Sequence, residues 1–338
     1  MGKQSSLNGS RLYCFIQTYK DEIFFSLVDY RNSRFTSENP DKIIEYYDSF
    51  KNRNDLIEWM KERPKGVANI YEVDGDKEII VVIPTADFNG KYAKECRENI
   101  FKGLHIIFVE SGGRGDFYFN IAHNINVGIK KAMEYNPKWV AFSGDDMYKI
   151  DDVRVLKEQL SALNNEEVDV VFTGPSMYHS APEMMAEKNI LFDLFYGITD
   201  KDAGREVIRL SKKYDIKYFF CPTSGKFSRL FKKGYEFTEI QSFGICSTRW
   251  VAKVNCNVED ETLINAGEDT DLSLRFSLDR GRIAFIDYRI GDIIGGTLGR
   301  GLDRNLRSIA GLCYLNLKWA KRIESLIERE KRRGDEIR

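Results

Sequence analysis

The sequence predicts an α/β protein built on a mostly parallel sheet. Several short runs of apolar, largely β-branched residues follow one another, and each ends at turn residues or carboxylates. Amphipathic helical patterns lie between these runs. Such runs suit strands buried on both faces, and their alternation with helices is typical of a parallel sheet. Ligands bind these sheets outside the carboxyl ends of the strands, so the residues after each run are the first candidates for a site.

Residues 1–77 are predicted to form a separate N-terminal α+β extension. Two aromatic-rich stretches, Tyr13–Thr18 and Ile23–Tyr30, flank a charged turn and predict a hairpin. Two short helical patterns follow at Lys42–Phe50 and Asn54–Lys61, and Pro64 ends the second. This region carries no evident chemistry.

Residues 78–300 are predicted to form the domain that carries the sheet. Its buried strand runs are Ile79–Ile83, Ile106–Val109, Trp139–Phe142 and Val168–Phe172, with later strands at Tyr218–Cys221 and Ile283–Ile286. Helical patterns cover Gly90–Phe101, Phe117–Met133 and Thr270–Leu278. Five of the eleven residues from Gly291 to Gly301 are glycine, which predicts a loop.

Residues 301–338 are predicted to form a long amphipathic C-terminal helix with a basic end. One stripe of this helix holds Leu306, Ile309, Cys313, Ala320 and Ile323. The stripe favours packing on the domain or on a second copy in a homo-oligomer. Peripheral contact with a membrane surface stays open as an alternative.

Composition narrows the class of protein. The 338 residues are 42% hydrophobic and 30% charged, which suits a folded core and excludes a disordered chain. The 51 basic and 52 acidic residues lack the basic excess of nucleic-acid-binding proteins. The longest apolar run, Ile79–Pro84, is too short to span a bilayer, and the polar start lacks the apolar segment of a signal peptide. We expect a cytoplasmic protein.

The metal ligands available are mainly carboxylates. Six scattered cysteines form no C-x-x-C pair and predict free thiols, and the three histidines form no H-E-x-x-H motif. A bound metal should therefore be a hard cation, Mg²⁺ or Mn²⁺.

Gly144-Asp145-Asp146 is the first candidate for chemistry, because it directly follows a buried strand. Adjacent carboxylates repel each other, and a divalent cation between them and a ligand phosphate relieves that repulsion. The alternative is a solvated turn before the helix that starts near Asp151 and Asp152.

Glu268 and Asp269 are the second candidate, at the predicted start of a helix. The helix dipole favours ionised carboxylates there, and an ionised Asp can accept a proton from a sugar hydroxyl. The alternative is ordinary capping, with Leu272 and Leu274 in the core and Arg275 in a surface pair.

Thr85, Asp87, Glu110 and Arg114 are the third candidate, at the ends of the first two strands. The carboxylates suit hydrogen bonds from a base or ribose, and Arg114 suits a phosphate. The glycine-rich segment 111–115 matches neither the dinucleotide fingerprint nor a P-loop. Taken separately, these are turn residues.

In this order, the pieces resemble the inverting glycosyltransferases of family 2, which have the GT-A fold. The matching segments are VVIPTAD (81–87), FVESGG (108–113), FNIAHNINVGIKKA (119–132), FSGDDM (142–147) and GEDTDLSLR (267–275). The resemblance implies a GT-A domain that takes a sugar from a nucleotide-sugar donor, with Mn²⁺ or Mg²⁺, to a glycan, lipid-linked or protein acceptor.

The resemblance also implies roles for single residues. It assigns the nucleotide to Pro84, Thr85, Ala86, Asp87, Glu110 and Asn124, the ribose to Asp145 and the metal to Asp146 with Asp145. It makes Asp269 the general base and Glu268 its neighbour on the acceptor side. The motif Gly-Asp-Asp lacks the first carboxylate of the family's D-x-D. Many members of the family have a late histidine near the metal, but this chain has no histidine after His179, and Asp292 is a conjecture for that role.

Two other functions remain open at this point. A catalytically degenerate GT-A domain would bind sugar or protein partners without turnover. A sugar nucleotidyltransferase shares the architecture but usually has a basic, glycine-rich loop after its first strand, unlike Pro84–Asn89. His123 is interpreted as structural or pocket-lining, and Phe243 and Trp250 as either acceptor contacts or core.

Overall fold

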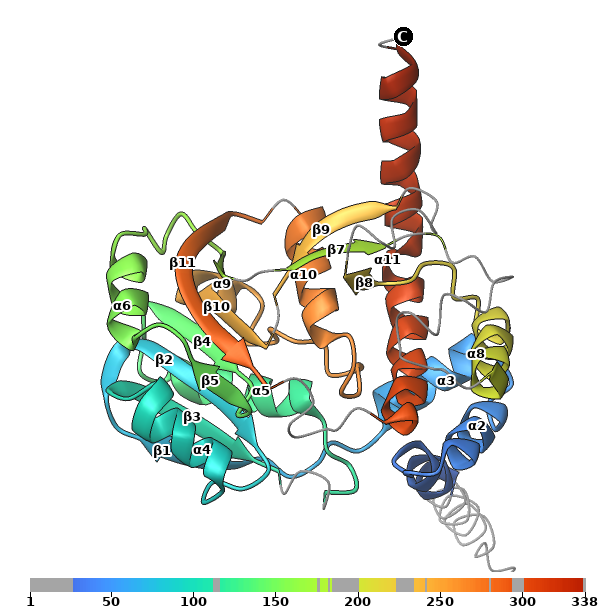
Figure 1. The fold of residues 1–338 in the computed structure, drawn as a ribbon, viewed down its shortest axis with the longest axis horizontal. Coiled ribbons are helices and arrows are strands. Elements are labelled where there is room, and N and C mark those ends of the chain that lie inside the picture. Colours follow the sequence, from blue (N-terminus) through green and yellow to red (C-terminus); the bar gives the residue numbers. More distant parts are fainter. Residues whose placement is uncertain are drawn as a thin grey trace, which may run out of the picture.

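The computed structural model describes residues 27–111, 116–174, 177–181, 183, 201–222, 234–240, 242–279, 281–293 and 301–336. These residues form an eight-stranded sheet flanked by helices, a three-stranded sheet, and a group of helices around the long helix α11 (Figure 1). The predicted α/β class is therefore confirmed.

The central sheet has a parallel core with antiparallel strands beside it. Its order is β1-β3-β2-β4-β10-β6-β11-β5. The bounds are β1 Asn69–Val73, β2 Asp76–Thr85, β3 Leu104–Glu110, β4 Trp139–Ser143, β5 Met147–Lys149, β6 Val170–Gly174, β10 Phe243–Ser247 and β11 Ile283–Asp292. Strand β2 runs parallel to β3 and β4, and β6 runs parallel to β11. The carboxyl ends of β2, β3 and β4 therefore share one edge.

Two layers of helices cover this sheet because alternate residues of its strands point to opposite faces. Ile79, Val81 and Ile83 of β2 pack towards one layer, made of α4 (Lys91–Glu95), a π-helical turn (Cys96–Ile100) and α6 (Val153–Ser161). Ile80 and Val82 pack towards the other layer, which holds α5 (Ile121–Met133), α9 (Thr248–Lys253) and α10 (Glu268–Leu278). Burial on both faces explains why β2 is an unbroken apolar run.

A second core lies where the N-terminal helices meet α11 (Leu302–Glu336). Residues 27–35 are helical, and with α2 (Pro40–Asp48), α3 (Arg53–Glu62) and α8 (Lys201–Lys213) they pack around the first turns of α11 (Figure 1). The buried hydroxyl of Tyr47 donates to the carbonyl of Leu306 at 2.6 Å. The small sheet, ordered β8-β7-β9, consists of β7 (Met177–Ala181), β8 (Cys221–Pro222) and β9 (Tyr235–Glu239).

Most predicted elements are present, with some differences. The predicted hairpin is wrong over residues 27–30, which are helical, and its first strand lies outside the described residues. The helix predicted from Phe117 begins at Ile121, because the side chain of Asn120 caps it by accepting from the amide of His123. The strand predicted at Tyr218–Cys221 is reduced to an isolated bridge at Tyr218 and the start of β8.

The segments at the predicted domain borders contact the sheet domain. Strand β1, inside the predicted extension, pairs with β3, and α11 continues to Glu336. The first two residues of the predicted glycine loop belong to β11, and residues 294–300 lie outside the described part of the chain. Among the described helices, none is long and apolar enough to cross a membrane.

Candidate active site

Three strand ends meet at the carboxyl edge of the parallel core. Thr85 at the end of β2 lies opposite Glu110 at the end of β3. The hydroxyl of Thr85 donates to Asp145 Oδ2, just beyond β4, at 2.8 Å. Glu110 Oε2 accepts from the backbone amide of Phe88 at 2.7 Å. Thr85 and Asp145 are thus in contact, and Glu110 lies beside Thr85 at the same edge of the sheet.

The other residues assigned to the nucleotide are arranged less uniformly. Pro84 is buried within β2, whereas Asp87 is exposed and accepts from the amide of Asn89 at 2.8 Å. Ala86 between them is half-buried. Asn124 is fully buried in α5 and donates to the carbonyl of Val67, two residues before Asn69, which pairs with Glu110 at the end of β3. Arg114 lies outside the described residues.

Asp145 and Asp146 differ in their surroundings. Asp145 is buried, whereas Asp146 is half-buried at the edge where β5 pairs with β11. The carbonyl of Asp146 accepts from the amide of Ile293 at 2.8 Å, and Asp292 lies opposite Met147 in the strand pair.

The carboxylates of Asp145 and Asp146 fit a hard cation whose other ligands come from the substrate and from water. Within the described residues no group of three or more His, Cys, Asp or Glu side chains could hold a metal. Mg²⁺ in nucleotide sites is commonly held by one or two carboxylates plus substrate phosphates and water, so such a group is not required. Asp146, with Asp145 beside it, provides that kind of incomplete set.

Glu268 and Asp269 open helix α10 in a largely desolvated environment. Gly267 before them has a φ of 91°, a left-handed conformation that favours glycine. Glu268 Oε1 accepts from the amide of Ala266 at 2.9 Å, and burial raises the pKa of Glu268 to about 7. Burial, followed by the charges of Glu239 and Glu268, raises the pKa of Asp269 well above its ordinary value. Carboxylates that ionise near neutral pH suit general acid–base chemistry.

The acid pair and the strand ends are connected through one short segment, which contacts both. The hydroxyl of Thr270 donates to Glu239, and the carbonyl of Ser242 accepts from the amide of Gly144 at 2.9 Å. Glu239 and Ser242 are three residues apart, so their Cα atoms are at most ~10–11 Å apart even in an extended chain. The hydroxyl of Ser242 also donates to Asp292.

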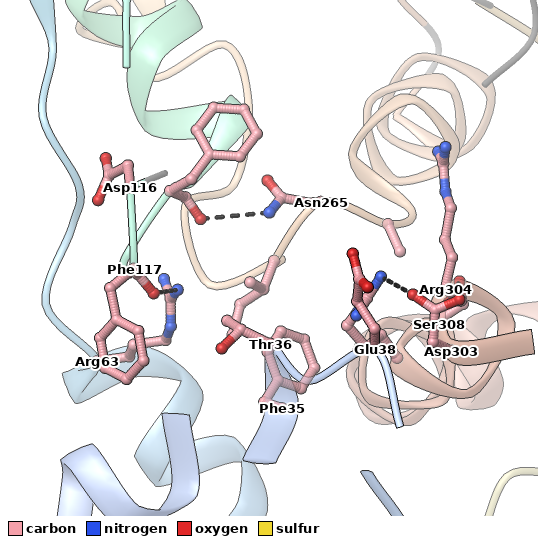
Figure 2. Close-up of a pocket in the computed structure, with 14 residues that line it drawn as sticks. Phe35, Thr36, Glu38, Arg63, Asp116, Phe117, Asn265, Asp303, Arg304 and Ser308 are labelled. Atoms are coloured by element: carbon pink, nitrogen blue, oxygen red, sulfur yellow. Dashed lines mark hydrogen bonds and ion pairs between the residues drawn. The ribbon is translucent and has the colours of Figure 1, made fainter. Parts of the chain in front are cut away.

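A cavity of about 250 Å³ lies next to the loop that precedes the acid pair (Figure 2). It is lined by the N-terminal helices, the segment 116–119, the loop before α10 and the start of α11, through residues that include Phe35, Arg63, Phe117, Asn265 and Arg304. Glu268 is connected to the cavity through Ala266, a lining residue whose amide donates to the Glu268 carboxylate. The charge of Arg304 favours the ionised form of Glu268 and partly offsets the effect of burial on its pKa.

The structure also places Phe243, Trp250 and His123, for which the sequence left two interpretations open. Phe243 and Trp250 belong to the hydrophobic cores on the two faces of the sheet, as the core interpretation predicted. His123 is half-buried on α5, with its Nδ1 3.1 Å from Glu261 Oε2. This contact favours the structural interpretation of His123.

His179 and Glu239 were not predicted. His179 Nε2 lies 2.7 Å from Glu239 Oε2, and both side chains are buried. The two residues are 60 positions apart and belong to no local motif. The polar residue Thr270, next to Asp269, was the one feature of the sequence that could have indicated a polar contact here.

No protein-family model matches the chain, and the curated proteins give no significant match. Functional assignment therefore depends on the geometry of the site.

Proposed function

We propose that the protein is a glycosyltransferase that moves a sugar from a nucleotide-diphosphate sugar to an acceptor hydroxyl with inversion. The main support is the arrangement of two polar groups that are connected through one short segment. One group, at the strand ends, offers oxygen atoms to a nucleotide and a cation. The other, Glu268 and Asp269, offers carboxyl groups whose raised pKa values bring ionisation close to neutral pH, so that an ionised Asp269 can accept a proton.

The reaction in this proposal is a single displacement. Asp269 accepts the proton of the acceptor hydroxyl, and the acceptor oxygen forms a bond to the anomeric carbon. The bond from that carbon to the diphosphate oxygen breaks at the same time, and its electron pair leaves with the diphosphate. Attack and departure on opposite faces invert the anomeric centre. An Mg²⁺ or Mn²⁺ ion on Asp146 would supply neutralisation of the charge on the departing diphosphate.

The cavity next to the loop before Glu268 supports a place for the acceptor. It is connected to Glu268 through Ala266, and its lining combines aromatic rings with charged and amide side chains. Figure 2 shows that Thr36 and Glu38 from the N-terminal part, and Asp303 and Ser308 from α11, contribute to the same lining as Asn265. In this proposal the N-terminal helices contribute to acceptor recognition.

Donor binding is the first test. Thermal unfolding should be followed with UDP-, GDP- and dTDP-sugars, each with and without Mn²⁺ or Mg²⁺, and with a CMP-sugar, which carries a single phosphate and lies outside the proposed donor class. We expect one nucleotide to raise the Tm in a metal-dependent manner, and Asp146→Asn to lose that increase. Asp287→Asn, which changes an exposed carboxylate of β11, should retain it. If no nucleotide shifts the Tm of the folded wild type, the donor site is misassigned.

Asp269→Asn tests the catalytic assignment. The amide keeps the shape of the side chain but cannot accept the proton, so transfer should be abolished while the donor-induced Tm increase is preserved. Transfer is measured with the donor identified by the binding screen. Loss of donor binding would show that Asp269 is not the base. Donor binding by the wild type without turnover would instead favour a degenerate binding domain.

A further inference from the structure

A buried histidine–glutamate pair contacts Thr270, the residue that follows Asp269. The proposed displacement does not use this pair. His179 on β7 and Glu239 on β9 have only 7% and 3% of their side chains exposed, and the atoms His179 Nε2 and Glu239 Oε2 are 2.7 Å apart. Burying two charges carries a desolvation cost that the attraction between them often only balances. Stability alone is therefore a weak reason for this pair.

A chain of contacts joins the pair to Asp269. The second oxygen of Glu239, Oε1, accepts from the hydroxyl of Thr270, which is itself buried. The backbone amide of Thr270 donates to Asp269 Oδ1 at 2.8 Å. The hydroxyl of Ser273, one turn further along α10, donates to the carbonyl of Asp269 at 2.7 Å. The orientation of the Asp269 side chain is thus linked to Glu239 through one residue.

The pair also sets the charge that Asp269 faces. Glu239 on β9 opposes ionisation of Asp269, whereas His179 on β7 favours it. Glu268 on α10 opposes ionisation as well, and Glu259, in the segment before α10, interacts repulsively with Asp269.

The charged groups of α11 act on other acids of α10. Arg304 faces Glu268, and Lys318 binds Asp271 at 2.9 Å. The small sheet therefore acts on Asp269 through two opposing charges, those of Glu239 and His179.

We propose that His179 and Glu239 are positioning residues, which hold the carboxylate of Asp269 through Thr270 and balance its charge environment so that it can ionise when the acceptor reacts. When His179 is protonated, its charge compensates the negative charge of Glu239. This inference rests on the proposed function for its catalytic meaning, but the coupling of charges can be measured without turnover.

The test follows the titration of Asp269 directly. The protein is labelled with aspartate carrying ¹³C in its carboxyl group, and the signal of Asp269 is the one lost in Asp269→Asn. In His179→Gln, which removes the positive charge, the titration midpoint should rise by about one pH unit. In Glu239→Gln, which removes the negative charge and keeps an acceptor for Thr270, the midpoint should fall by about one pH unit.

The double variant and a second histidine provide the controls. His179→Gln combined with Glu239→Gln should give a midpoint between those of the two single variants, because the charges of His179 and Glu239 act on Asp269 in opposite directions. His105 is also buried, and its Nε2 lies 3.0 Å from Glu72 Oε2, but this pair is on β3 and β1. His105→Gln should leave the Asp269 midpoint unchanged.

The outcomes separate this inference from the proposed function. Opposite shifts in the two single variants support the inference, and the acidic limb of kcat/KM for transfer should then move in the same directions. An unchanged midpoint in Glu239→Gln overturns it, even if His179→Gln fails to fold. Opposite shifts in a protein that transfers no sugar would support the charge coupling and reject the glycosyltransferase proposal.

Discussion

At the scale of single residues, Glu268 combines deep burial with an acidic group. Only 7% of the residue is exposed, and its pKa rises from 4.5 to about 7 chiefly because burial disfavours the charged form. The native state therefore holds a proton that the unfolded chain releases at lower pH. Stability from this group is fully present below about pH 4.5 and is lost as the pH rises through 7.

This difference predicts the pH dependence of Glu268→Gln. A separation of roughly 2.5 pH units corresponds to about 3 kcal/mol. The wild type should therefore lose up to about 3 kcal/mol of unfolding free energy relative to Glu268→Gln between pH 4.5 and pH 8, as measured by urea unfolding. Exposed Glu166 supplies the control, since Glu166→Gln should follow the wild type at every pH. A constant difference between wild type and Glu268→Gln would mean that Glu268 is ionised throughout this range.

The residues that the sequence did identify share one property. Thr85, Glu110 and Asp145 each follow a buried run, and parallel neighbours must bring such positions to one edge. His179 and Glu239 obey no such rule, because their contact depends on how the small sheet packs against α10. Tertiary pairing of this kind leaves no periodic signal in a single sequence.

At the scale of elements, helix α5 shows how closely a helix and the sheet pack. Gly128 faces the sheet, and a Cβ atom placed there would lie 2.3 Å from Val82 Cγ1 and 2.9 Å from Val109 Cγ2. These distances are shorter than ordinary contacts, so an added methyl group must displace the helix or the strands. The glycine allows α5 to approach β2 and β3 directly.

Gly128→Ala should therefore destabilise the protein. Overpacking of a core costs about 1–3 kcal/mol, which we expect to exceed the gain of up to about 1 kcal/mol in helix propensity. Lys130→Ala, on the exposed side of the same helix, should change the stability by less than about 0.5 kcal/mol. Urea unfolding of both variants gives the comparison. A stability gain in Gly128→Ala would show that α5 can move away from the sheet without loss.

The elements that were predicted and those that were missed differ in burial. Strands β2 and β4 are buried along most or all of their length, and continuous apolar runs mark them. Strand β1 is mostly exposed at the edge of the sheet, so it lacks such a run. Residues 27–30, which begin the helix over 27–35, were predicted as part of a hairpin because their aromatic and β-branched residues suit both structures.

At the scale of the whole molecule, α11 joins the two cores. Leu306 and Ile309 in its first part pack with the N-terminal helices, whereas Leu315 and Ile323 pack with α10 and the small sheet. Beyond these contacts, its C-terminal part projects from the body of the protein (Figure 1). The sequence predicted the length and amphipathic character of this helix, but the partners on each side depend on tertiary structure.

Polar contacts between α10 and α11 are of two kinds. Fully buried Asp271 accepts from Trp319 Nε1 at 2.8 Å and from Lys318 Nζ at 2.9 Å. Exposed Asp279 pairs with Arg322 at 2.8 Å, near the other end of α10. Both pairs connect the same two helices, but only the first is shielded from water.

The two pairs should therefore contribute unequally to stability. Removing one partner of a buried ion pair typically costs about 3–5 kcal/mol, whereas an exposed pair contributes at most about 1 kcal/mol. We expect Asp271→Asn to lower the unfolding free energy by about 3 kcal/mol or more, and Asp279→Asn by less than about 1 kcal/mol, in urea unfolding followed by circular dichroism. Equal effects would mean that the buried contacts do not join α11 to α10. A large effect confined to Asp271→Asn would make this junction a main support of the helix that carries Glu268 and Asp269, and thus of the proposed catalytic centre.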